Sequence, residues 1–114
     1  MSQNKRIDRI NEEIKKELAD IIRSLKDPRI PEMTSVVRVE VTGDLRFCKA
    51  YISIMGTDEE RENAIKGLES ASGFVRREIG SRLDLRFTPE FTFISDTSIE
   101  YGAMINKLFK DGID

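Results

Sequence analysis

The sequence predicts a single α+β domain in which helices cover one face of a small sheet. Apolar residues recur with helical spacing near the beginning, then with a spacing of two, and then with helical spacing again. The chain has 114 residues, the size of one domain, so we expect one domain over residues 1–114. The formal net charge is −2, and this near-neutral charge with periodic apolar residues argues against disorder.

The first element is expected to be a helix with one apolar stripe. Its apolar residues recur every three or four positions: Ile7, Ile10, Ile14, Leu18, Ile21, Ile22 and Leu25. Ser2 or Asn4 would cap its beginning. Asp27-Pro28 would end it, because the residue before a proline avoids the helical conformation. Residues 27–31 then form a stiff surface connection.

Residues 33–42 change to the alternation of a half-buried strand, with Val37, Val39 and Val41 on one side. Gly43-Asp44 predicts a turn, and the strand that follows completes an antiparallel hairpin. The second strand is expected to direct one set of residues inward (Cys48, Ala50, Ile52 and Ile54) and another outward (Phe47, Lys49, Tyr51 and Ser53).

Gly56-Thr57-Asp58 ends the hairpin and caps a helix whose first turn is acidic, as the helix dipole favours. Small residues then interrupt the pattern, and the apolar spacing resumes beyond them. We expect an interhelical kink at Ala71, Ser72 and Gly73, because glycine weakens a helix interior. The alternative is close packing of a neighbour against a small side chain.

A third strand is expected at Glu90–Ser95, directly after Pro89, with Phe91 and Phe93 in the core. Residues 97–114 would form either a short terminal helix, capped by Asp96, or a flexible tail. The complete order is α-β-β-α-kink-α-β, with the helices on one face of a three-stranded sheet.

Composition excludes several classes of function. The sequence has no His and one Cys, which excludes His-based catalysis, a disulfide within the chain and Cys-based zinc sites. No apolar run approaches the roughly 20 residues that span a bilayer, and no apolar signal segment is present. We therefore expect a cytoplasmic monomer that needs no cofactor or metal and does not bind membranes.

Two groups of cations are candidates for binding RNA phosphates. Lys5, Arg9, Lys16 and Arg23 fall within about 40° of one another on the first helix, opposite the apolar stripe. They span about 27 Å at 1.5 Å per residue. The alternative is a solvated face with ion pairs, such as Glu12 with Lys16.

The second group lies beyond the kink and comprises Arg76, Arg77, Arg82 and Arg86. These four do not form one row on a helix, so only the fold could gather them. The alternative is capping and pairing between elements. Further candidates are Arg29 in the proline-rich connection, and Arg46 and Lys49 in the hairpin; Lys49 alternates with Tyr51, which is expected to pack rather than to stack on a base.

The chain resembles the ribosome-binding factor A family, whose fold is a type II KH domain. The resemblance is carried by the stretches Asp27-Pro28-Arg29, 39–46, 50–56, 71–76 and 86–96. It implies a maturation factor that binds the 30S ribosomal subunit and 16S rRNA at a late step, without catalysis, and with a role in cold adaptation. Ser70-Ala71-Ser72-Gly73 stands where KH domains have a Gly-x-x-Gly loop, which favours recognition of folded RNA by shape and phosphates.

Two alternatives from other classes of function remain open. A protein-protein interaction module could dock through the acidic stretch 58–62 or through the C-terminal segment. A small hydrolase would depend on carboxylates such as Asp44 and Asp96, although no spacing pairs them and turn or cap roles suffice for both.

Overall fold

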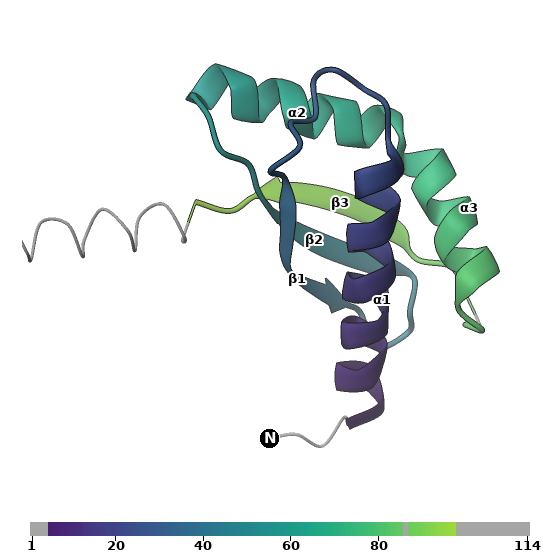
Figure 1. Ribbon diagram of the computed structural model, residues 1–114. Coiled ribbons are helices and arrows are strands. Elements are labelled where there is room, and N and C mark those ends of the chain that lie inside the picture. Colours follow the sequence, from purple (N-terminus) through teal and green to yellow (C-terminus); the bar gives the residue numbers. More distant parts are fainter. Residues whose placement is uncertain (1–4, 86, 98–114) are drawn as a thin grey trace, which may run out of the picture.

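The three helices pack on one face of a three-stranded sheet (Figure 1). The computed structural model describes residues 5–85 and 87–97. The elements are α1 (Lys5–Ser24), β1 (Ser35–Val41), β2 (Phe47–Ser53), α2 (Asp58–Ser70), α3 (Ser72–Arg82) and β3 (Glu90–Ser95). This is the predicted α+β order. The predicted caps at Ser2 and Asn4, and the predicted terminal helix or tail beyond residue 97, lie outside the described residues.

Helix α1 buries the predicted stripe against the sheet, and Ile14, Leu18 and Ile21 are fully buried. The Ser24 hydroxyl donates to the carbonyl of Ile21 at 2.6 Å, which satisfies one of the carbonyls left free where the helix ends. The chain then enters the Asp27-Pro28 connection, as the sequence predicts.

The sheet has the order β1-β2-β3, with β2 antiparallel to β1 and parallel to β3. A bulge between Val36 and Arg38 leaves Val37 only partly buried. The predicted alternation in β1 is therefore confirmed at Val39 and Val41 but not before them. Ser53, which was expected to face outward, is buried.

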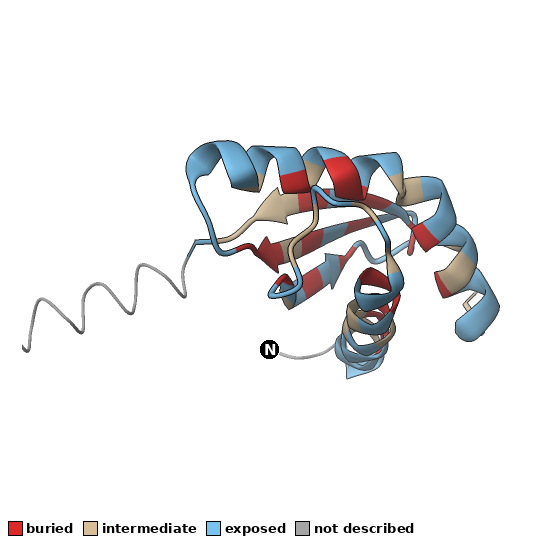
Figure 2. Cartoon of the chain, turned by 45° about the horizontal axis from the view of Figure 1, so that its top comes forward, coloured by how far each residue is buried: buried red, intermediate tan, exposed pale blue. Residues whose placement is uncertain are grey.

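The core lies where the helices meet the sheet (Figure 2). Phe91 and Phe93 of β3 are buried with their ring centroids 6.1 Å apart, which confirms their predicted place in the core. Helix α1 contributes Ile14, Leu18 and Ile21 to the fully buried part of the core, and strand β2 contributes Ala50 and Ile52. Lys49 and Thr92 are exposed on the other face of the sheet, opposite the described helices (Figure 1).

The chain kinks between α2 and α3 at Ala71, whose ψ of 4° departs from the helical value. A Cβ atom built at Gly73 would meet no atom within 4 Å, so close packing does not explain that glycine. The predicted kink is confirmed, and its break lies at Ala71. Close approach occurs instead at Gly67, where a Cβ would lie 3.2 Å from side-chain atoms of Asp27 and Ile30.

Thr57 caps α2 by a reciprocal arrangement. Its hydroxyl accepts from the Glu60 amide at 3.1 Å, and the Glu60 carboxylate accepts from the Thr57 amide at 2.7 Å. We expect Thr57→Ala to lower the free energy of unfolding by about 0.5–2 kcal/mol, because the Glu60 amide loses its side-chain acceptor and the reciprocal cap is broken. Urea denaturation measures this change. Thr57→Ser keeps the oxygen, and a loss in that variant as large as in Thr57→Ala would contradict the capping role.

Candidate nucleic-acid interface

The cation row on α1 is exposed along the whole helix: Lys5, Arg9, Lys16 and Arg23. Arg23 lies 3.4 Å from the carboxylate of Asp20. Among the described residues, no carboxylate oxygen lies within 4.0 Å of the ammonium group of Lys16, so the predicted Glu12–Lys16 pair does not form. The row thus has the exposure that phosphate contact requires, and its contact with RNA stays a prediction.

Arg82 has a different environment from the other predicted cations. Its guanidinium lies 3.1 Å from Glu17 and 2.7 Å from Asp20, both on α1, and 3.4 Å from Glu78 on α3. The hydrogen bond from Arg82 lowers the pKa of Asp20 below its usual range. Arg82 therefore joins α3 to α1 through two carboxylates of α1 and also pairs with Glu78 within α3, which is the alternative that its sequence left open. We do not include it in the interface proposed below.

Arg29 also has an ion-pair partner within its own connection. Its guanidinium donates to both carboxylate oxygens of Asp27, at 3.0 and 2.7 Å, and its amide donates to the same side chain at 2.9 Å. These hydrogen bonds lower the pKa of Asp27 to about 2. A further contact of 3.4 Å reaches the Ser70 hydroxyl at the end of α2. Arg29 thereby ties the proline-rich connection to the kink.

Three predicted arginines converge on one surface, although they come from distant parts of the sequence. Arg46 follows the β1–β2 turn, while Arg76 and Arg77 lie on α3. Arg46 and Arg76 line a hollow together with Phe47, Phe87, Thr88 and Glu90. An adjoining hollow is lined by Gly73, Arg76, Arg77, Gly80 and Thr88. Since the hollows share Arg76 and Thr88, we treat all nine residues as one region, the arginine surface.

Two contacts hold this surface in place. The Arg76 guanidinium donates to the carbonyl of Thr88 at 3.2 Å, and the amide of Glu90 donates to the carbonyl of Arg46 at 2.8 Å. A Cβ on Gly80 would lie 2.8 Å from the Thr88 hydroxyl oxygen, so glycine lets the segment before β3 approach α3. Arg86, the remaining member of the predicted group, lies outside the described residues.

The arginine surface has the features of a nucleic-acid interface. Guanidinium groups bind phosphate oxygens with paired, charge-assisted hydrogen bonds. Phe47 and Phe87 are 54% and 45% exposed, and exposed aromatic rings are the groups on which bases stack. The sequence placed Phe47 on the outer strand face without a binding role and assigned none to Phe87; their position beside Arg46 and Arg76 is visible only in the fold.

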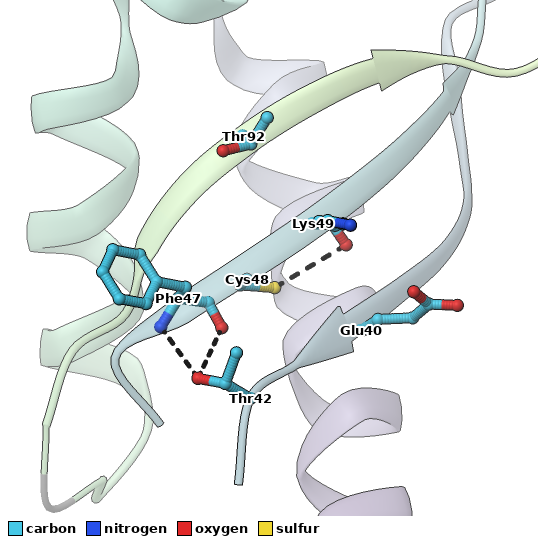
Figure 3. A pocket seen from close by; sticks show the side chains of 6 residues that line it. All are labelled: Glu40, Thr42, Phe47, Cys48, Lys49 and Thr92. Carbon is cyan, nitrogen blue, oxygen red and sulfur yellow. Dashed lines mark hydrogen bonds between the residues drawn. The ribbon is translucent and has the colours of Figure 1, made fainter. Parts of the chain in front are cut away.

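The sheet face opposite the helices adjoins this surface through Phe47. A third hollow lies on this face and is lined by Glu40, Thr42, Phe47, Cys48, Lys49 and Thr92 (Figure 3). The predicted cation Lys49 is exposed on this face. Tyr51 packs as predicted: the Arg38 guanidinium lies 3.9 Å from its ring centroid, and its hydroxyl donates to Glu40 at 3.3 Å.

The carboxylates considered for catalysis have structural partners. Asp44 accepts from the Thr42 hydroxyl at 2.7 Å and from the Arg46 amide at 3.1 Å, and these bonds lower its pKa. Asp96 lies 3.4 Å from Arg38. Within residues 5–85 and 87–97, no group of three His, Cys, Asp or Glu side chains is placed to hold a metal ion. In the same part of the chain, no helix is long and apolar enough to cross a membrane.

Comparisons with known proteins give one consistent result. A family model described as ribosome-binding factor A matches residues 6–109. Ribosome-binding factor A of Acetivibrio thermocellus is 55% identical over 107 residues, which are 93% of this chain and 87% of that protein. The same factor of Clostridium novyi is 51% identical over 107 residues, 93% of this chain and 88% of that protein.

Solved structures agree with the sequence comparisons. The solution structure of a Thermotoga maritima protein, assigned as a ribosome binding factor A, matches with a TM-score of 0.76 and 36% identity, over 88% of this chain and 95% of that one. The crystal structure of the Thermus thermophilus factor has a TM-score of 0.71 at 22% identity, over 78% and 93% of the two chains. A model of the Thermus factor fitted into a map of its 30S complex has a TM-score of 0.64 at 23% identity, over 76% and 91%.

Proposed function

Because this chain belongs to the ribosome-binding factor A family, we propose that it binds the 30S ribosomal subunit and its 16S rRNA during late maturation of that subunit. It acts in the cytoplasm as an assembly factor and catalyses no reaction. The fold supports this proposal, since its three helices and three-stranded sheet match those of ribosome-binding factor A structures. A role in cold adaptation belongs to the same proposal.

The convergence of Arg46, Arg76 and Arg77 is the observation that favours the arginine surface as the place where RNA binds. The whole chain has a net charge of −2, so its average field repels RNA, and binding requires cations that are sorted in space. No described carboxylate lies within ion-pair distance of Arg76 or Arg77, and Arg46 is 3.8 Å from exposed Asp44. These three side chains therefore keep donors available for phosphates.

Absence of catalysis is supported by the roles of the carboxylates. A general acid needs a raised pKa near neutrality, whereas the pKa of Asp44 is lowered by its hydrogen bonds. The acidic stretch 58–62, which could have marked a docking surface, is explained in part by the capping of α2. The protein acts instead by binding: when it is bound to the subunit, it stabilises the rRNA conformation that it fits best.

We expect Arg76→Gln/Arg77→Gln to weaken binding to purified 30S subunits about 10- to 100-fold at low salt, because two phosphate contacts are lost. Affinity measured from 50 to 300 mM KCl reports the number of phosphates neutralised. The slope of log affinity against log salt should become shallower by about 1.4–1.8 in the double variant, at 0.7–0.9 for each phosphate.

A matched control removes the same charge elsewhere. Lys26→Gln/Lys66→Gln lowers the net charge by two at exposed positions outside the arginine surface, and it should leave most of the slope intact. Equal losses in the two double variants would show that only overall charge matters and would reject this surface. A third variant, Lys5→Gln/Arg9→Gln/Lys16→Gln, tests the α1 row independently.

A further inference from the structure

We propose that the hollow between the β1–β2 turn and α3 receives the base of one unpaired RNA nucleotide that carries an exocyclic amino group. The hollow is lined by Arg46, Phe47, Arg76, Phe87, Thr88 and Glu90. This inference rests on the proposed function and adds a base-binding site to a surface that was otherwise proposed to bind phosphate groups. Its ligand is cytosine, adenine or guanine in a single-stranded segment, and uracil is disfavoured.

Two partly exposed aromatic rings line this one hollow. Phe47 and Phe87 are 54% and 45% exposed, and both contribute to the same lining. The ring of Phe47 stands out from the start of β2 (Figure 3), where the Phe47↔Glu90 register places it beside β3. A partly exposed apolar ring is stabilised when a base stacks on it, and duplex RNA offers no free base face.

Two arginines lie beside these rings in the lining of the hollow. The Arg46 guanidinium carbon lies 5.6 Å from the centroid of Phe87, within the range of a cation–π contact. Arg76 is anchored by one donor on the Thr88 carbonyl, which leaves its other donors to a ligand. A nucleotide in the hollow can therefore place its base on a ring and its phosphate on an arginine at the same time.

Glu90 is the acidic residue in the lining of the hollow. A site built for phosphate alone is weakened by an acidic lining residue, because like charges repel. Glu90 nevertheless lines the hollow, is exposed, and has no ion pair within the described part of the chain. A carboxylate accepts hydrogen bonds from the amino groups of bases, as it does from cytosine N4. Uracil has no exocyclic amino group, so the lining favours the other bases.

Fluorescence anisotropy with the full chain and labelled RNA tests the inference. The probes are a ten-nucleotide oligocytidine, a ten-nucleotide oligouridine and an A-form duplex of ten base pairs. We expect the oligocytidine to bind about fivefold more tightly than the oligouridine, on the scale of one amino–carboxylate hydrogen bond. The duplex carries more phosphates, and stronger binding to it than to either single strand would overturn the inference.

Two variants separate stacking from charge. Phe87→Leu keeps an apolar side chain but removes the ring, and it should weaken oligocytidine binding about tenfold with an unchanged salt slope. Glu90→Gln should abolish the preference for oligocytidine over oligouridine, since an amide pairs with both bases. Phe74→Leu is the matched control, because Phe74 is 39% exposed on α3 but does not line the hollow; it should bind as the unchanged protein does.

The outcomes distinguish this inference from the proposed function. If Phe87→Leu binds both single strands and 30S subunits normally while Arg76→Gln/Arg77→Gln loses subunit binding, the base site is rejected and the phosphate surface stands. If all these variants retain subunit binding, the proposed surface is rejected as well. A normal circular dichroism spectrum and unfolding transition for each variant confirms that a loss of binding does not come from unfolding.

Discussion

Ile52→Ala is expected to lower the free energy of unfolding by about 2–5 kcal/mol, the range for emptying a buried isoleucine position. Ile52 is fully buried in β2, the central strand, and its carbonyl accepts from the Asp96 amide at 2.8 Å just beyond β3. The loss has two parts: apolar area returns to water, and a cavity is left where helices and sheet meet. Total stability for a domain is about 5–15 kcal/mol, so the variant should approach unfolding at moderate temperature. Urea denaturation measures the change.

Two controls define what this result means. Ile52→Val removes one methylene group and should cost about 0.5–1.5 kcal/mol. Met55→Ala changes a side chain that is 52% exposed, and it should change stability by less than about 0.5 kcal/mol. A cost for Ile52→Ala no larger than that of Met55→Ala would show that β2 is not packed against the helices as described.

Stability is expected to fall steeply above pH 9 because of Cys48. This side chain is 1% exposed, and burial raises the pKa of its thiol from an ordinary value near 9 to about 12. Between these values the unfolded chain loses the proton while the folded protein retains it. The unfolded state then binds fewer protons, so stability decreases as pH rises, by about 1.4 kcal/mol per pH unit. The stability is complete below pH 9 and is lost progressively from pH 9 toward pH 12.

Comparison with Cys48→Ala isolates the thiol. Urea denaturation at pH 8, 9, 10 and 10.5 gives the slope of stability against pH for both proteins. All other side chains are the same in the two proteins, so the difference between the two slopes reports Cys48. The variant should be less stable at pH 8, since a buried side chain is shortened, but its decline above pH 9 should be shallower. Parallel slopes would show that the thiol is reached by water in the folded protein.

Sequence periodicity predicted the regular elements because the spacing of apolar residues along one helix or strand already shows which side of that element will be buried. The residues of α1 that repeat every three or four positions are the ones buried, and β3 has the predicted bounds Glu90–Ser95. The bulge near Val36 was not predicted, since a strand's register depends on its partner as well as on its own alternation. The burial of Ser53 was also not predicted, because it depends on the segments that pack around this residue and not on the alternation within β2.

The candidate site was predictable as a set of residues but not as a surface. Arg46, Arg76 and Arg77 were each candidates in the sequence, and the hairpin and α3 bring them together. Arg82 stood in the same group, yet Glu17 and Asp20 of α1 engage it across more than 60 residues of sequence. No local sequence pattern distinguishes an arginine that lines the surface from one that is held in ion pairs, because each outcome depends on which element packs beside the arginine.

The sequence alone determined the order of helices and strands, the apolar faces of α1 and β3, the kink between α2 and α3, and the exclusion of chemistry that needs histidine. These properties follow from backbone preferences and from side chains spaced within one element. Only the tertiary structure decided which arginines remain available to a ligand and which aromatic rings stay partly exposed beside them. Whether an arginine is available to a ligand depends on which groups from distant segments lie within a few ångströms of it. The packing of the helices on the sheet sets those distances.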